Sequence, residues 1–269
     1  MKESICSVKI LPFLIAFLIL ISCQKKGTIE VISNQTGNIL FNFNHLNNGN
    51  VLLFDTLIYK TSTGNQYMVN DLQYFISGVQ VHKTNDGWKQ IATDKGIHYT
   101  DARDKSTFAW QTNGLSVGTY DSAGFIFGLI AADNYSNRFP DPPERDMFWP
   151  GILGGGYHYM KMDLKWKSNG MPEAMPFMFH LGIGQIYKGD SVNTDSISGY
   201  VQNYFMVRSF VPFIITRNQT TQINIIMNVE KWFDSQNAFD FAAYPMGIMQ
   251  DQDGMHKACL NGSNAFVVK

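Results

Sequence analysis

Apolar and polar residues alternate with a period of two through most of the chain from Thr28 onward. In residues 39–45 the odd positions are Ile, Phe, Phe and His, while Asn occupies two of the even positions. This alternation is typical of a β-strand with one buried face. Similar patterns predict further strands at residues 74–81, 125–129, 157–166, 175–181, 214–216 and 223–229.

Short polar clusters separate the predicted strands, at residues 47–49, 84–87, 111–114, 167–170 and 217–219. Asn and Gly in these clusters favour tight turns. We expect helix only at Ala131–Ser136 and at Glu230–Phe241. The chain is therefore predicted to be an all-β, two-sheet antiparallel β-sandwich with short helical insertions, in one domain over residues 37–269. A proline-rich loop, Arg138–Glu144, is its longest irregular stretch.

The N-terminus has the pattern of a secretory signal. Lys2 and Lys9 precede the apolar run 10–21, which is shorter than the roughly 20 residues that a membrane span needs. Residues 20–23, Leu-Ile-Ser-Cys, resemble the lipobox of bacterial lipoproteins. We expect residues 1–22 to be a signal peptide and Cys23 to be lipidated, with residues 23–36 forming a tether and the first strand. The alternative is an ordinary signal peptide cut near Ser22.

A lipid on Cys23 would place the protein in the cell envelope, on the outer or inner membrane, facing the periplasm or the cell surface. Cys6 would leave with the signal, so Cys259 would be the only free thiol of the mature chain and no internal disulfide would form. Removing residues 1–22 leaves 19 basic and 21 acidic side chains of the 21 and 22 in the whole chain. This balance argues against nucleic acid as a partner.

Two common sequence signatures of catalysis, the H-E-x-x-H and Walker motifs, are missing from the chain. The carboxylates Asp141, Glu144 and Asp146 share one loop, but no nucleophile accompanies them, and such clusters are usually solvated. We therefore predict that the protein is not an enzyme.

Three histidines lie on separate predicted strands near methionine or aromatic residues. His45 continues the apolar face of its strand, His158 shares a face with the methionines at 160 and 162, and His180 shares one with Met178. Imidazole and thioether are ligands that copper accepts, so converging strands would form a copper site. The alternative for each histidine is a core residue bonded to a backbone carbonyl. His82, His98 and His256 are interpreted as surface or turn residues.

Three segments, taken in order, resemble the MbnP-like copper-binding domain found in methanotroph copper proteins and in lipoproteins of Bacteroidota. The first comprises Phe41–His45, the sequence Asn-Val-Leu-Leu from Asn50, and residues 65–77. The second is Met147–Met162, which contains Trp-Pro and Gly-Gly-Gly-Tyr-His-Tyr-Met-Lys and is the most specific. The third is Phe177–Gly182. The resemblance extends from about Gly37 to the C-terminus.

The resemblance implies a β-sandwich with one copper ion bound by histidines, of which His45 and His180 match the family positions best and His158 belongs to the lipoprotein variant of the motif. It also implies a tryptophan oxidised to kynurenine by a dihaem, MauG-like peroxidase, with Trp149 as the candidate. Along the chain, no tryptophan lies beside a histidine at the close spacing of some kynurenine sites.

The sequence thus favours a membrane-anchored copper-binding lipoprotein that serves copper acquisition, storage or delivery. The predicted ligands are His45 and His180, completed by His158 or Met178. The alternative is a lectin-like or adhesive sandwich that binds carbohydrate or another non-metal ligand through exposed aromatics near Phe139 and Phe148.

Overall fold

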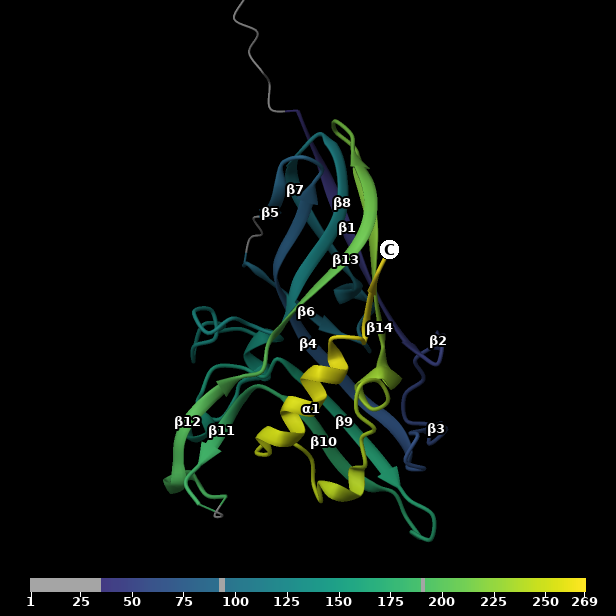
Figure 1. Cartoon of the computed structure of the whole chain (residues 1–269), viewed down its shortest axis with the longest axis vertical. Coiled ribbons are helices and arrows are strands. Elements are labelled where there is room, and N and C mark those ends of the chain that lie inside the picture. The colour runs from purple at the N-terminus through teal and green to yellow at the C-terminus, as the bar shows by residue number, and fades with distance from the viewer. Residues whose placement is uncertain (1–34, 92–94, 190–191) are drawn as a thin grey trace, which may run out of the picture. The chain divides into compact units, whose positions relative to one another are not determined.

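A computed structural model describes residues 35–91, 95–189 and 192–269, which belong to one compact unit, Asn34–Lys269. The predicted signal peptide, Cys23 and most of the predicted tether lie outside the described residues. Two main sheets face each other and a two-stranded sheet is attached to them (Figure 1). The predicted β-sandwich is confirmed. Among the described residues, no helix has the length and apolar character needed to span a membrane.

The first sheet has the order β15 (Phe266–Val268), β14 (Thr220–Asn228), β1 (Thr36–Asn47) and β2 (Asn50–Val51), and β7 (Ala109–Ser116) also pairs with β1. The odd positions 37–45 of β1 are buried, as the alternation predicts, and His45 points inward with them. One feature differs from the prediction: β1 and β14 run parallel, from Asn38↔Thr220 to Leu46↔Asn228. A parallel pair needs a long crossover, and here the rest of the domain supplies it.

The second sheet has the order β10 (Met175–Leu181), β9 (Met160–Lys167), β4 (Gln66–Lys83), β8 (Gly118–Phe127) and β13 (Phe205–Ile215). β4 also pairs with β3 (Tyr59–Lys60), β5 (Gly87–Gln90) and β6 (Ile97–Asp101). The attached sheet consists of β11 (Ile183–Tyr187) and β12 (Ile197–Gln202), and β11 follows β10 directly after Gly182.

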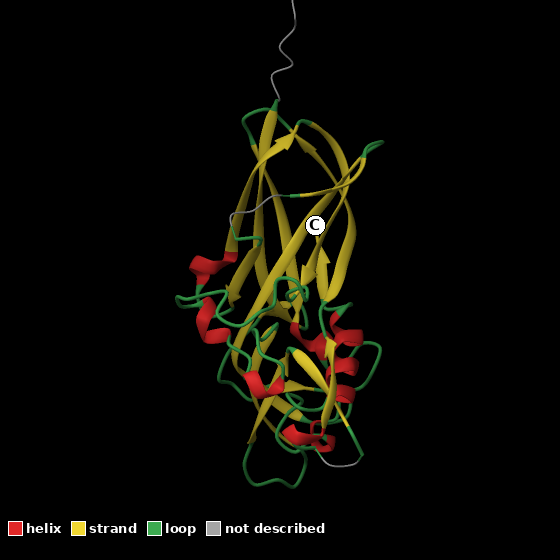
Figure 2. Ribbon diagram, turned by 90° about the vertical axis from the view of Figure 1, so that its left-hand side faces the viewer, coloured by secondary structure: helices red, strands yellow, loops and turns green. Residues whose placement is uncertain are grey.

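The helical segments differ from those predicted. In the described ranges α1 (Gln252–Gly262) is the single α-helix, and the Asp251 side chain caps it by accepting from the Gly254 N–H. The 3-10 turns are η1 (Lys105–Phe108), η2 (Glu144–Met147), η3 (Gly151–Leu153), η4 (Thr194–Ser196), η5 (Val229–Trp232) and η6 (Phe241–Ala243). The helical segments lie toward one end of the sandwich (Figure 2).

The predictions of a helix at Ala131–Ser136 and at Glu230–Phe241 were wrong. The first forms turns, and the second consists of η5, an irregular stretch and the start of η6. The side-chain amide of Asn261 donates to the carbonyls of Trp232 at 3.0 Å and Asn237 at 2.8 Å. Those carbonyls therefore bond to α1 instead of to a following helical turn.

Cys259, in α1, is partly buried, and burial raises the pKa of its thiol to about 12.

Aromatic rings fill the space between the sheets. Phe127, on β8, is fully buried and packs against Phe205, Trp232 and Phe266, with ring centroids 4.9, 5.1 and 5.7 Å away. These partners come from β13, η5 and β15. The Phe127 ring therefore contacts residues of both main sheets and of the turn η5.

Phe127→Ala is expected to lower the free energy of unfolding by about 3–5 kcal/mol, because the cavity it leaves is lined by rigid rings. Denaturant titration of the mature domain measures this change. Phe210→Ala is the control, since Phe210 lies on the neighbouring strand and is 77% exposed. Similar losses for the two variants would contradict the assignment of Phe127 to the core.

Candidate metal centre

The loop between η2 and β9 is closed by main-chain hydrogen bonds. The Trp149 N–H donates to the Gly156 carbonyl at 2.8 Å, and the His158 N–H donates to the Met147 carbonyl at 2.7 Å. Gly154, Gly155 and Gly156 have φ values of 117°, 70° and 79°, a region in which glycine pays no steric cost. The three glycines thus let the chain reverse and bring Trp149 next to His158.

His180 lies on the face of β10 opposite the core. Its register partner is Lys161 on β9, and directly opposed residues of an antiparallel pair share a face. The core face of β10 carries Phe177, Phe179 and Leu181. The inward orientation of His45 on β1 therefore does not hold for His180 on β10. His180 is nevertheless only 7% exposed, and the His158 ring lies against it.

The imidazole rings of His158 and His180 meet edge to face, with centroids 5.1 Å apart and planes at 84°. Nδ1 of His158 lies 3.0 Å from the Met147 carbonyl oxygen, and Nε2 of His180 lies 2.9 Å from Asp163 Oδ1. Because both oxygens accept, each of these nitrogens carries the proton. In a neutral ring the other nitrogen then bears a lone pair.

Those remaining nitrogens, Nε2 of His158 and Nδ1 of His180, are both buried, and neither has a hydrogen-bond partner among the described residues. Burial, with a further contribution from His180, lowers the pKa of His158 to about 3, so this ring is neutral at physiological pH. The hydrogen bond from His180 lowers the pKa of Asp163, which keeps this carboxylate ionised. The arrangement offers two buried lone pairs on adjacent rings.

Trp149 completes the cluster. It is fully buried, its ring centroid lies 4.6 Å from that of His158, and its Nε1–H donates to the Leu153 carbonyl at 3.1 Å. A Cβ atom on Gly182 would lie 2.6 Å from Cε3 of the indole. Only glycine at position 182 allows the indole to pack this closely.

The other predicted ligands lie differently. His45 contacts Tyr74 through Nε2 at 3.0 Å and packs against Phe108. None of its hydrogen bonds or ring contacts in the described ranges involves His158 or His180. The structure therefore pairs His180 with His158, not with His45. Met178 is partly buried and lies opposite Asp163 in register, on the same face as His180. No group of three or more His, Cys, Asp or Glu side chains in the described part of the chain is arranged to hold a metal ion.

Sequence reasoning missed Asp163 and the Met147 carbonyl, which orient the two rings. An acidic residue within the alternating pattern of β9, next to a histidine-bearing strand, was a usable signal for Asp163. No sequence signal could have identified the Met147 carbonyl, because every residue type has a backbone carbonyl. His98, which was interpreted as a surface or turn residue, stacks between Phe43 and Trp110 at centroid distances of 4.8 and 5.1 Å.

Comparison with known proteins decides the family. The family model described as MbnP matches residues 36–250, which is most of the chain. The chain belongs to the MbnP family. This is a copper-related family associated with methanobactin. The residues of the cluster fit such a metal, since two buried imidazole nitrogens lack partners.

The solved structure of MbnP from Methylosinus trichosporium is similar, with 14% identity, a TM-score of 0.49 and coverage of 76% of this chain and 80% of that one. The comparison with curated proteins gave no match.

Gly182→Ala is expected to displace the Trp149 indole and to lower the free energy of unfolding by about 1–3 kcal/mol, because the added methyl overlaps the ring. Tryptophan fluorescence and denaturant titration report the two effects. Gly151→Ala, in the loop that carries Trp149, is the control, since a Cβ there meets nothing within 4 Å. An unchanged spectrum and stability for Gly182→Ala would contradict the packing described for Trp149.

Proposed function

We propose that this MbnP-family protein binds one copper ion through Nε2 of His158 and Nδ1 of His180, without catalytic turnover, and serves copper acquisition, storage or delivery. The observation that carries the proposal is the pair of buried, unpartnered nitrogens on adjacent rings. An unpartnered buried nitrogen costs free energy, so a bound cation that accepts both lone pairs offsets that cost. Membership of a copper-related family supports the choice of metal.

The ligand set favours copper(I). Two neutral imidazoles leave the full charge of the ion uncompensated in a buried place, and desolvating one unit of charge costs less than desolvating two. Imidazole suits copper, whereas structural zinc takes four ligands. Among the described residues no third His, Cys, Asp or Glu ligand is in place. Met178, on the same face as His180, is the nearest candidate by register for a thioether ligand.

Asp163 belongs to the proposed site as the residue that orients His180. A carboxylate that accepts from one ring nitrogen fixes the tautomer and makes the other nitrogen a better ligand. The Met147 carbonyl does the same for His158. The two rings thus keep different nitrogens free of a hydrogen bond, Nε2 in His158 and Nδ1 in His180.

Trp149 remains the candidate for oxidation to kynurenine. Its ring contact with His158 would place the modified side chain beside the proposed ligands. Members of this family pair with a MauG-like protein, MbnH, and we propose a partner of that class here. We also retain the proposal that lipidated Cys23 anchors the protein to an envelope membrane.

His158→Ala and His180→Ala are each expected to weaken copper(I) binding by at least about tenfold, since each removes one ligand nitrogen. Competition with a chromogenic copper(I) chelator, on the mature domain under reducing conditions, measures stoichiometry and affinity. His256→Ala is the matched control, because His256 is an exposed histidine on α1. His45→Gln tests the ligand set predicted from the sequence, and we expect it to retain one copper ion. Wild-type affinity in both single variants would refute the assignment of the site.

Asp163→Leu is expected to weaken copper(I) binding about 10- to 100-fold, whereas Asp163→Asn is expected to retain more of it, because the amide oxygen still accepts from His180 Nε2. Nitrogen-15 NMR of the copper-free imidazoles reports the tautomer, and only Asp163→Leu should release His180 from the Nε2-protonated form. Asp71→Leu is the control, since Asp71 opposes Asp163 on β4 and carries the same charge. Equal effects of Asp71→Leu and Asp163→Leu would show that charge, not orientation, is responsible.

A further inference from the structure

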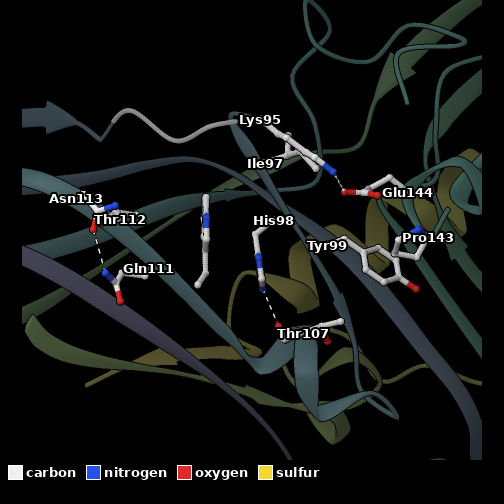
Figure 3. A pocket seen from close by; sticks show the side chains of 11 residues that line it. Lys95, Ile97, His98, Tyr99, Thr107, Gln111, Thr112, Asn113, Pro143 and Glu144 are labelled. Atoms are coloured by element: carbon white, nitrogen blue, oxygen red, sulfur yellow. Dashed lines mark hydrogen bonds and ion pairs between the residues drawn. The ribbon is translucent and has the colours of Figure 1, made fainter. Parts of the chain in front are cut away.

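A cavity of about 450 Å³, shown in Figure 3, is lined by neither His158 nor His180. Its walls come from β6, β7 and the start of η2. In the described ranges β6 pairs only with β4, and β7 only with β1, so each leaves one edge without a neighbouring strand. The volume falls within the roughly 300–1,000 Å³ of small-molecule sites.

One wall is a stack of aromatic rings. His98 lies between Phe43 and Trp110, with planes within 18° and 10° of parallel. Its Nε2–H donates to the Thr107 carbonyl at 2.7 Å (Figure 3), so Nδ1 carries the lone pair. Burial lowers the pKa of His98 to about 4, so the ring is an uncharged acceptor at neutral pH. Both neighbouring rings hold it in place.

A charged pair forms the opposite wall. Lys95 Nζ lies 2.6 Å from Glu144 Oε1, and Figure 3 shows the pair across the cavity from Asn113. The Glu144 side chain is only 11% exposed, whereas that of Lys95 is 61% exposed. The pair adds no net charge to the cavity, but it provides strong donors and acceptors side by side.

The third set of polar groups comes from β7. Gln111 Nε2 donates to Asn113 Oδ1 at 3.0 Å, and this bond leaves both amides with further donor and acceptor capacity. Thr112, between them, is 2% exposed, and its Oγ1 has no hydrogen-bond partner among the described atoms. A buried hydroxyl without a partner points to a bound group that the cavity is built to receive.

We propose that this cavity binds an uncharged sugar of one or two rings. Its walls offer donors and acceptors of both kinds, which suits a ligand whose hydroxyl groups each donate and accept. Trp110 ends the stack and lines the cavity, so its ring, and not that of the covered His98, suits the apolar face of a sugar ring. An anionic ligand would meet the carboxylate of Glu144, and a cationic ligand would meet Lys95, so neither charge is favoured. None of the residues that line this cavity belongs to the proposed copper site.

The test is saturation-transfer NMR of the mature domain with N-acetylglucosamine, maltose, cellobiose and lactose as probes, followed by titration of any sugar that responds. At least one of these sugars is expected to bind, and glucuronate, the charged analogue, is not. Thr112→Val is expected to weaken binding about three- to tenfold through loss of one hydrogen bond, while leaving the melting temperature unchanged or higher. Gln111→Ala, at an exposed position, is expected to act in the same direction.

Thr100→Val is the matched control, because Thr100 on β6 is also a fully buried threonine but does not line the cavity. The proposal is overturned if none of the four sugars binds, or if Thr112→Val and Gln111→Ala bind as the wild type does. It is also overturned if adenosine or a neutral dipeptide binds more tightly than every sugar. Copper titration of the same variants should match the wild type, which separates this result from the fate of the copper proposal.

Discussion

Among the described residues, the adjacent rings of His158 and His180 each hold one nitrogen out of water without a partner, and each such nitrogen costs the fold about 1–3 kcal/mol. The surrounding structure must therefore be stable enough to keep the rings of His158 and His180 from turning outward to solvent. The antiparallel ladder of β9 and β10 runs unbroken from Met175↔Trp166 to Leu181↔Met160, and it fixes where His180 emerges. The closed loop from Met147 to His158 fixes the second ring.

Packing beneath the ladder supplies this rigidity. The core face of β10 places Phe177 and Phe179 against Phe239 and Phe241, while Trp149 is wedged against Gly182 on the other side. The turn η2 has a further role, because its first residue, Glu144, pairs with Lys95 and its last residue, Met147, orients His158. The polar cavity and the histidine pair are thus built on opposite ends of one four-residue turn.

The features that could be predicted from sequence were the local ones. Alternation in β1 correctly predicted its buried face, including His45, and many short strands with polar turns correctly predicted a sandwich. The features that were missed depend on distant contacts. The parallel pairing of β1 with β14 joins residues about 180 positions apart, and the bonds from Asn261 replace the expected helix after Val229. Likewise, Trp149 and His158 are nine residues apart along the chain, yet the Gly-Gly-Gly reversal brings their rings into contact.

His45 and His180 illustrate why burial alone does not identify a ligand. Each ring is nearly buried, and each has one nitrogen bonded to an oxygen and one without a partner. The difference lies in the rings that pack against each imidazole. Phe108 packs against the His45 ring, and burial lowers the pKa of His45 to about 4, so this ring is a neutral core residue beside Tyr74. A second imidazole lies against His180 only because strand register and loop closure act together. The pair of adjacent, buried imidazoles is a property of the assembled fold, and no single strand pattern encodes it.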